Sequence, residues 1–354
     1  MSFIQAIGLA HAPFSHSQQE IIDFILDNFS VPEEDHSKIR RMYAQSEIET
    51  RYSVVEDFSL PKSNWRFFEK EGKTSIEKRM KTFFQLAPDL CCKAVQKILS
   101  TDDLQHITHL ITVSCTGMSA PGLDVQLVQR LNLPNHIHRT AINFMGCYAG
   151  IQALKQADAF CRAFQHAKVL IVDVELCTLH FNNEYTMDNI ASSLLFADGA
   201  AAVFVSNDIG KFSLNHFYSE LALKGYHDMA WNLSSHGFQM NLSGYVPSII
   251  AENIEPLLHN ALSGLNINRN DVSHWAIHPG GKKIIHEIAK ALSLSSEDVH
   301  YSKNILYYYG NMSSVTIFFV LEKMMADKLP AKNTIFACAF GPGLTIESLI
   351  LQVC

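Results

Sequence analysis

Apolar residues recur every three or four positions in several stretches of the chain, a spacing typical of amphipathic helices. In the first half this spacing predicts helices over residues 18–29, 75–99, 122–131 and 149–164. The second of these stretches contains Pro88, which predicts a kink because proline removes a backbone hydrogen bond inside a helix. In the second half the same spacing predicts helices over residues 248–263, 282–292 and 313–327.

Short runs rich in valine, isoleucine and threonine lie between these helical stretches and predict buried strands. The predicted strands cover residues 106–115, 137–144, 168–176, 200–206, 274–278, 333–340 and 344–353. Strands that alternate with helices are typical of a parallel sheet with helices on both faces. The pattern therefore predicts an α/β protein built on a parallel sheet.

The two halves of the chain end in a similar way, which predicts a duplicated α/β unit. Each ends with an apolar run, a turn that contains glycine and a further apolar strand; the turns are Ala197-Asp198-Gly199 and Gly341-Pro342-Gly343. We place the boundary near residues 207–210, giving an N-terminal half (1–208) and a C-terminal half (209–354). The length of 354 residues agrees with about two domains of ~150 residues each.

Composition and charge exclude several classes of protein. Hydrophobic residues make up 47% and charged residues 18% of the chain, which is ordinary for a globular fold. The net charge is −7 and the basic residues are scattered, so nucleic acid is not an expected partner. No apolar run approaches the roughly 18 residues of a membrane span. The start of the chain lacks the features of a secretory signal, and we therefore expect a cytoplasmic protein.

The cysteines do not predict a disulfide framework or a metal site. There are eight, and without a secretory signal a set of disulfides is not expected. No Cys-x-x-Cys pair occurs, and the histidine pairs have no cysteine or acidic companions at ligand spacing. We expect neither a metal ion nor another bound cofactor.

Cys147 stands out from the other cysteines through its position between a predicted strand and a predicted helix. Residues 143–150 read Asn-Phe-Met-Gly-Cys-Tyr-Ala-Gly, with the strand ending at Phe144 and the helix beginning just after Cys147. A helix N-terminus stabilises negative charge, so this position predicts a lowered thiol pKa and a nucleophilic cysteine. The flanking Gly146 and Gly150 allow a sharp turn and close packing.

Two residues of the second half are candidate partners for that thiol. His278 ends a predicted strand and is followed by Pro-Gly-Gly, and Asn311 follows a glycine at the start of a predicted helix. Ligands of open α/β sheets bind at the carboxyl ends of the strands, where all three residues would lie. We predict a Cys147–His278–Asn311 site, in which His278, if protonated, would hold Cys147 as a thiolate.

These segments resemble the type III polyketide synthases, the chalcone synthase-like family of the thiolase-fold superfamily. The resemblance runs from about Lys38 to the C-terminus and includes the segment around Cys147. The other matching segments are Leu-Phe-Ala-Asp-Gly-Ala-Ala-Ala at 195–202, His-Pro-Gly-Gly at 278–281, Tyr-Gly-Asn-Met-Ser-Ser at 309–314 and Phe-Gly-Pro-Gly-Leu-Thr-Ile-Glu at 340–347. The resemblance implies a five-layered αβαβα thiolase-like fold, a homodimer, and Cys147, His278 and Asn311 as the catalytic triad.

The resemblance also implies roles for residues around the triad. It matches Phe196 to the family's gatekeeper phenylalanine, and Lys38 and Arg41 to two of its basic CoA-binding positions, whereas a third basic position is Gln45 here. It places Trp231 on the cavity wall where the family often has glycine, and Cys115 and Cys177 at two pocket positions, as in bacterial members. Ala120 matches the residue that reaches into the neighbouring subunit in plant relatives.

The implied activity is an iterative decarboxylative condensation of malonyl-CoA onto an acyl-CoA starter held on Cys147, followed by cyclisation to a pyrone, a resorcinol or a polyhydroxynaphthalene. Two alternatives stay open at this point. A ketoacyl synthase III would share the fold and triad but take its extender from acyl carrier protein. A cysteine hydrolase would have the same order of Cys, His and Asn, although the residues around Cys147 differ from those of papain-like enzymes.

Overall fold

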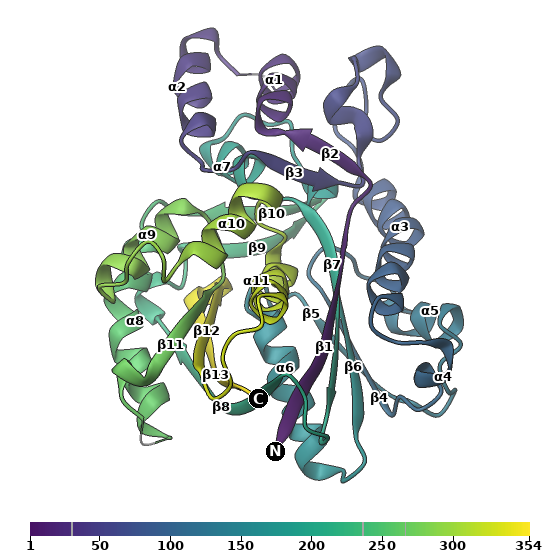
Figure 1. Cartoon of the computed structure of the whole chain (residues 1–354). Coiled ribbons are helices and arrows are strands. Elements are labelled where there is room, and N and C mark those ends of the chain that lie inside the picture. Colours follow the sequence, from purple (N-terminus) through teal and green to yellow (C-terminus); the bar gives the residue numbers. More distant parts are fainter. Residues whose placement is uncertain (30, 236, 266) are drawn as a thin grey trace.

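The computed structural model describes residues 1–29, 31–235, 237–265 and 267–354. Among these residues nine strands form one sheet, in the order β11-β12-β13-β8-β1-β7-β6-β4-β5 (Figure 1). The N-terminal part of the sheet consists of β1 (Ser2–His11), β4 (His109–Ser114), β5 (His138–Asn143), β6 (Lys168–Leu176) and β7 (Asp198–Ser206). The C-terminal part consists of β8 (Phe212–Leu221), β11 (Val272–Ile277), β12 (Thr334–Gly341) and β13 (Thr345–Val353).

The sheet is mixed, so the prediction of a parallel sheet is wrong. Strand β4 pairs in parallel with β5 and β6, and β11 pairs in parallel with β12. The remaining pairs, β6–β7, β7–β1, β1–β8, β8–β13 and β13–β12, are antiparallel. Only a short turn at Pro342–Leu344 joins β12 to β13, whereas a parallel pair needs a crossover of a dozen or more residues.

The predicted likeness of the two chain halves at their ends is therefore only partly correct. In the C-terminal half the Gly341-Pro342-Gly343 turn does join two strands. In the N-terminal half the apolar run before Asp198 is not a strand but the helix α7 (Met187–Leu195).

Helices cover both parts of the sheet and separate them, which gives the expected five layers. Helices α6 (Ala149–Ala163) and α11 (Thr316–Ala326) lie in the middle, because each contacts strands of both parts. Helices α3 (Ile76–Gln96) and α5 (Leu123–Arg130) pack on the outer face of the N-terminal part. Helices α8 (Val246–Ser263), α9 (Lys282–Ala291) and α10 (His300–Tyr309) form the layer outside the C-terminal part (Figure 1).

The central helix α11 shows why this arrangement suits the sequence. Its residues Ile317, Phe318, Phe319 and Val320 are consecutive, and all four are buried. A helix that is apolar on every side is stable only when other elements surround it, as the two parts of the sheet do here. This middle layer is the core shared by the two halves.

All seven predicted helices occur, with ends that differ by at most three residues, and Pro88 lies inside α3 without ending it. Several elements were not predicted. They are β1, β8, α7, α10, the helices α2 (Glu33–Ala44) and α4 (Thr101–Leu104), and the two small hairpins β2 (Phe14–Ser17) with β3 (Thr50–Ser53) and β9 (Met229–Ser234) with β10 (Gly237–Leu242). Within the described ranges, no helix combines the length and the apolar composition that crossing a bilayer requires.

Candidate active site

Cys147 lies in the tight connection between β5 and α6, as the sequence predicts. The turn before it is strained, because Phe144 and Gly146 both have positive φ angles, 60° and 86°. A side chain at position 146 would bring its Cβ to 2.2 Å from Cδ of Pro342, so only glycine fits there. The turn that carries Cys147 therefore packs closely against the loop that joins β12 to β13.

His278 and Asn311 come together at Gly280. His278 follows the last residue of β11, and its backbone N–H donates to the Cys338 carbonyl at 2.8 Å. The Asn311 amide nitrogen Nδ2 donates to the Gly280 carbonyl at 3.2 Å. A Cβ on Gly280 would lie 3.6 Å from Nε2 of His278. The imidazole and the carboxamide therefore flank the same glycine.

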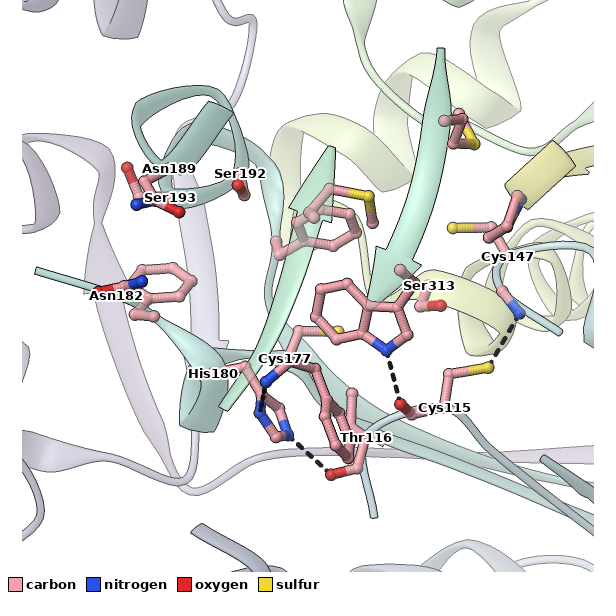
Figure 2. Close-up of a pocket in the computed structure, with 18 residues that line it drawn as sticks. Cys115, Thr116, Cys147, Cys177, His180, Asn182, Asn189, Ser192, Ser193 and Ser313 are labelled. Atoms are coloured by element: carbon pink, nitrogen blue, oxygen red, sulfur yellow. Dashed lines mark hydrogen bonds between the residues drawn. The ribbon is translucent and has the colours of Figure 1, made fainter. Parts of the chain in front are cut away.

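The thiol of Cys147 lines a cavity of about 40 Å³ (Figure 2). Neither His278 nor Asn311 is among the residues that line it, and among the described residues no hydrogen bond joins Cys147 to either. Ser313 connects Cys147 to Asn311. Its side chain lines the cavity and hydrogen-bonds the Cys147 sulfur. Its backbone N–H donates to Oδ1 of Asn311 at 2.8 Å. Ser313 therefore links Cys147 to Asn311, whereas the His278 ring lies beside Gly280 and neither of its nitrogens has a hydrogen-bond partner among the described residues.

Burial disfavours the charged forms of both the thiol and the imidazole in this geometry, which opposes a thiolate–imidazolium pair in the resting site. Burial raises the pKa of Cys147 to about 12 and lowers the pKa of His278 to about 3. A shift of three pKa units corresponds to about 4 kcal/mol, whereas a charge at a helix end typically gains only about 0.3–1 kcal/mol. Desolvation therefore outweighs the helix N-terminus on which the prediction relied.

Phe196 is fixed beside Asn311 by its backbone. The Asn311 N–H donates to the Leu195 carbonyl and the Ala197 N–H donates to the Asn311 carbonyl, both at 2.9 Å. The Phe196 side chain is 7% exposed and lines the Cys147 cavity. This backbone bridge therefore connects Phe196, which lines the Cys147 cavity, to the segment that carries Asn311.

Arg51, on β3, binds the backbone of the segment around Phe196. The sequence does not predict this role. Its Nη1 donates to the carbonyls of Ser193 and Phe196, at 2.6 and 2.9 Å. The guanidinium is fully buried, and burial lowers its pKa to about 10. A buried charge is costly unless it is bonded, and among the described residues only Nη1 has hydrogen-bond partners, whereas Nε and Nη2 have none. Arg51 therefore holds the segment through one nitrogen.

Trp231, Cys115 and Cys177 lie on the wall of the Cys147 cavity, the location that the resemblance implied. The Trp231 indole N–H donates to the Cys115 carbonyl at 2.8 Å (Figure 2). The Cys115 sulfur in turn accepts from the backbone N–H of Gly146 at 3.0 Å. These bonds connect one wall of the cavity to the turn that carries the nucleophile.

His180 is a further wall residue that the sequence analysis missed. Its Nδ1 accepts from the Phe238 N–H at 3.1 Å, and its Nε2 donates to the Thr116 carbonyl at 2.8 Å (Figure 2). Its ring stacks on Phe238 with 4.3 Å between centroids. Burial lowers the pKa of His180 to about 3, so the ring is neutral and both nitrogens are engaged. No sequence motif indicates this histidine, because its role depends on distant backbone atoms.

We expect His180 to make the fold sensitive to acid. Its folded-state pKa lies below the usual 6.5, so the unfolded chain binds the proton more readily. The stability that neutral His180 contributes is present above about pH 6.5 and is lost as the pH falls towards 3, at up to ~1.4 kcal/mol per pH unit. Urea unfolding between pH 7 and 5 should show a shallower loss for His180→Gln than for wild type. The exposed His106→Gln is the control, and equal slopes in all three proteins would contradict the prediction.

Two buried carboxyl groups lie behind the cavity. Asp173 and Glu175 are two residues apart on β6 and are both inaccessible to solvent. The Ser314 hydroxyl lies 2.8 Å from a carboxyl oxygen of each. Glu175 also accepts from the Cys115 N–H and the Thr116 hydroxyl. Burial raises the pKa of both carboxyl groups, and the neighbouring Glu175 raises that of Asp173 further, well above its usual value.

Lys38 and Arg41 are exposed on α2 and line neither the Cys147 cavity nor any other described cavity. The helical spacing places them one turn from Met42 and Gln45, which do line a larger cavity of about 510 Å³. This second cavity, which we call the mouth cavity, also contains Gly280. Among the described residues no cluster of three or more His, Cys, Asp or Glu side chains is arranged to hold a metal ion.

Comparison with known proteins shows which family the chain belongs to. Residues 1–209 match the family of chalcone and stilbene synthase N-terminal domains, and residues 218–354 match the corresponding C-terminal domains. The chain is 31% identical, over 95% of its length and 87% of the relative's, to the "alpha-pyrone synthesis polyketide synthase-like Pks18" of Mycobacterium tuberculosis. It is 29% identical to a "probable polyketide synthase 1" of Dictyostelium discoideum, of whose length it covers only 11%.

The solved structures agree with the sequence matches. The crystal structure of "PKS-I from the brown algae Ectocarpus siliculosus" superposes with a TM-score of 0.92, at 26% identity, over 100% of this chain and 98% of that one. The chain therefore belongs to the chalcone and stilbene synthase family. Its fold is the thiolase-like fold of type III polyketide synthases, and its activity class is that of these acyltransferases.

Proposed function

We propose that the chain extends an acyl-CoA starter, held as a thioester on Cys147, by repeated decarboxylative condensation with malonyl-CoA. The product would then cyclise to a pyrone, a resorcinol or a polyhydroxynaphthalene. One observation carries the proposal more than any other: Asn311 and the side chain of His278 meet at Gly280, one backbone bridge away from the cavity that Cys147 lines.

In the loading step the Cys147 sulfur attacks the thioester carbon of the starter. Because the thiol and imidazole are neutral at rest, the proton moves from the sulfur to His278 as the new bond forms. His278 is suited to accept it, since both of its ring nitrogens are buried and neither has a hydrogen-bond partner among the described residues. The proton then passes to the CoA thiolate as it leaves, and acyl-Cys147 remains.

In the extension step malonyl-CoA loses carbon dioxide, and its thioester oxygen takes up the negative charge. The Asn311 carboxamide uses one N–H for Gly280 and has a second one for this oxygen. Neutral His278 is the second donor, through its one ring N–H. Phe196 offers an apolar surface that disfavours the malonyl carboxylate and favours its loss. The enolate carbon attacks acyl-Cys147 and the carbon–sulfur bond breaks. The released Cys147 thiolate then takes up one proton from the solvent, the proton that each decarboxylative condensation consumes.

The direct test is product analysis by mass spectrometry, with purified protein, malonyl-CoA and a panel of acyl-CoA starters. The proposal requires products whose mass grows by one decarboxylated malonyl unit per extension. A requirement for malonyl-acyl carrier protein would instead favour a ketoacyl synthase III type of reaction. Release of free acid without carbon dioxide would favour a hydrolase.

Trp231 should limit the length of the product. The cavity at Cys147 has room for roughly three water molecules, and the fixed indole ring occupies one wall. We expect Trp231→Gly to shift the product profile towards longer chains, as measured by mass spectrometry of the products. The control is Trp231→Phe, which keeps an aromatic ring on that wall. A product profile for Trp231→Gly that matches wild type would contradict a role for Trp231 in chain length.

We further propose that Lys38 and Arg41 bind the phosphates of coenzyme A. Both side chains are exposed on the helix whose next turn lines the mouth cavity, and both are cationic. The cavity leads inward to Gly280, next to His278, which supports the entry of a thioester from this side.

We also propose a cytoplasmic homodimer. The eight cysteines are all free thiols in the described chain, which suits a reducing compartment. Strand β5 is an edge of the sheet, and its residues His138, Arg139, Ala141 and Asn143 are exposed. Met118, half exposed, and Ala120 lie beside it around the same hollow, so a second copy could cover this edge. Light scattering should then give about 79 kDa, twice the chain mass of 39.7 kDa.

A further inference from the structure

Phe181 is a wall of the Cys147 cavity and also of a further cavity, which lies outside the proposed condensation site. The further cavity has a volume of about 330 Å³, a size typical of pockets that hold small molecules. It lies between α1 (Gln18–Asn28), the start of α3 and residues 54–75, the segment that connects β3 to α3 and runs beside α1 (Figure 1). We call it the aromatic cavity, because its lining includes Phe24, Phe29, Trp65, Phe68 and Phe181.

The aromatic side chains give this cavity flat apolar surfaces. The ring of Phe24 lies 5.1 Å from that of Trp65 and 5.5 Å from that of Phe68, so the three rings form one cluster. Phe24 is buried, whereas Trp65 and Phe68 are only partly buried. A planar ring that enters the cavity can therefore stack on the uncovered parts of Trp65 and Phe68.

Arg79, on α3, brings a buried positive charge to the same cavity. Its side chain lines the cavity and the residue is 2% exposed; burial lowers its pKa to about 10, so it stays charged at neutral pH. Its Nε donates to the Thr74 carbonyl at 3.1 Å, and its Nη1 donates to the carbonyls of Leu179 and Phe181. Among the described residues neither a hydrogen-bond acceptor for Nη2 nor a carboxylate partner for the guanidinium occurs. A buried charge without a counter-ion is costly, so this N–H group favours an anionic ligand.

The charged residues at the rim add to this positive charge. The Lys62 ammonium group lies over the Trp65 ring, 5.7 Å from its centre. The Glu69 carboxylate is paired with Lys78 at 2.7 Å and is therefore largely neutralised. Apart from Glu69, the charged residues that line the cavity are the cations Lys62, Lys70 and Arg79 and the exposed anion Glu71.

We infer that the aromatic cavity binds a planar aromatic carboxylate, with its ring stacked on Trp65 and Phe68 and its carboxylate bonded to Nη2 of Arg79. A carboxylate forms a strong, charge-assisted hydrogen bond with a guanidinium N–H. The inference does not depend on the proposed function, because Cys147 is not among the described residues that line this cavity. Arg79 also holds the Phe181 backbone, which connects an occupied aromatic cavity to the wall of the Cys147 cavity.

Quenching of tryptophan fluorescence by 4-nitrobenzoate tests where such a ligand binds. The chain has three tryptophans: Trp65 lines the aromatic cavity, Trp231 lines the Cys147 cavity, and Trp275 is buried in the core. We expect saturable quenching in wild type and in Trp231→Phe, and its loss in Trp65→Phe. Quenching that is lost in Trp231→Phe and kept in Trp65→Phe would place the ligand at Cys147 and overturn the inference, as would the absence of saturable binding to wild type.

Equilibrium dialysis with the same probe tests the role of charge. The neutral analogue 4-nitrobenzamide should bind at least about tenfold more weakly than 4-nitrobenzoate, because it lacks the anion that Arg79 favours. Lys62→Glu reverses a charge at the exposed rim and should raise the Kd for 4-nitrobenzoate about three- to tenfold. Lys81→Glu makes the same reversal at an exposed position of α3 outside the cavity lining and should leave the Kd unchanged.

Arg79→Lys tests the proposed contact itself, because lysine keeps the charge but has no Nη2. It should raise the Kd for 4-nitrobenzoate about tenfold. Circular dichroism shows whether this buried variant folds, and Lys62→Glu provides the test of charge if it does not. Equal Kd values for the carboxylate and the amide, or equal effects of Lys62→Glu and Lys81→Glu, would overturn the inference and leave the proposed condensation at Cys147 unaffected.

Discussion

Replacing Cys147 by alanine should abolish product formation, with a loss of at least about 10³-fold in turnover. The starter has to be held as a thioester, and alanine has no atom that can form one. The other thiols of the cavity, Cys115 and Cys177, do not substitute, because they lie on its wall rather than in the strained turn between β5 and α6. Alanine keeps the Cβ and the backbone at this position, so the change removes chemistry rather than structure.

Intact-mass spectrometry after incubation with acyl-CoA measures the loading step directly. Wild type should gain the mass of one acyl group, and Cys147→Ala should gain none. Cys161→Ala is the matched control, since Cys161 is a buried cysteine on α6, the helix that follows Cys147, and it packs in the core instead of lining the cavity. An acylated Cys147→Ala protein, or an equal loss of acylation in Cys161→Ala, would remove Cys147 from the nucleophile role.

The position of the nucleophile could be predicted because it depends on local pattern. A strand, a glycine, a cysteine and a helix follow one another within ten residues, and the structure has the same order around Cys147. The ionisation state could not be predicted, because it depends on how deeply the thiol and His278 are buried. That burial comes from elements far away in the chain, such as the loop at Pro342 that closes over the turn.

The sequence indicates the relative direction of only some of the strands. The short Gly341-Pro342-Gly343 turn between two apolar runs indicates an antiparallel pair, because so few residues cannot connect parallel strands. The antiparallel pairing of β6 with β7 gave no such signal, because a helix lies between them, as it does between parallel strands. Strand β1 was missed because it lies between β7 and β8, and its partners follow it by some 200 residues.

The residues that support the site also cannot be predicted from the local sequence pattern. Arg51 acts on carbonyls more than 140 positions away, and His180 depends on the backbone of Thr116 and Phe238. Ser313 lay inside a recognised motif, but its contact with Cys147 becomes visible only when the two halves of the chain meet. Sequence reasoning thus found the groups that we propose to react and missed those that hold them in place.

Removing the Asn311 donor should slow the loss of carbon dioxide from malonyl-CoA by about 10²–10³-fold, the usual cost of one donor to a developing oxyanion. The side chain has two functions that substitutions can separate. Its Oδ1 accepts from the Ser313 N–H and so supports the local fold, whereas Nδ2 is the donor. Asn311→Asp keeps the acceptor and loses the donor, and Asn311→Ala loses both.

Release of carbon dioxide from malonyl-CoA, measured in the Cys147→Ala background, isolates this step from loading. Both Asn311 variants lose the Nδ2–Gly280 bond and should be less stable than their parent, so the rate is compared per folded protein. Asn311→Asp keeps the contact with the Ser313 N–H and should still lose decarboxylation. His278→Gln retains an amide donor near the same position, so its loss should be smaller, about tenfold. If Asn311→Asp decarboxylates malonyl-CoA at the parental rate, then Asn311 only shapes the backbone before α11, and the oxyanion of the enolate must find its donors elsewhere.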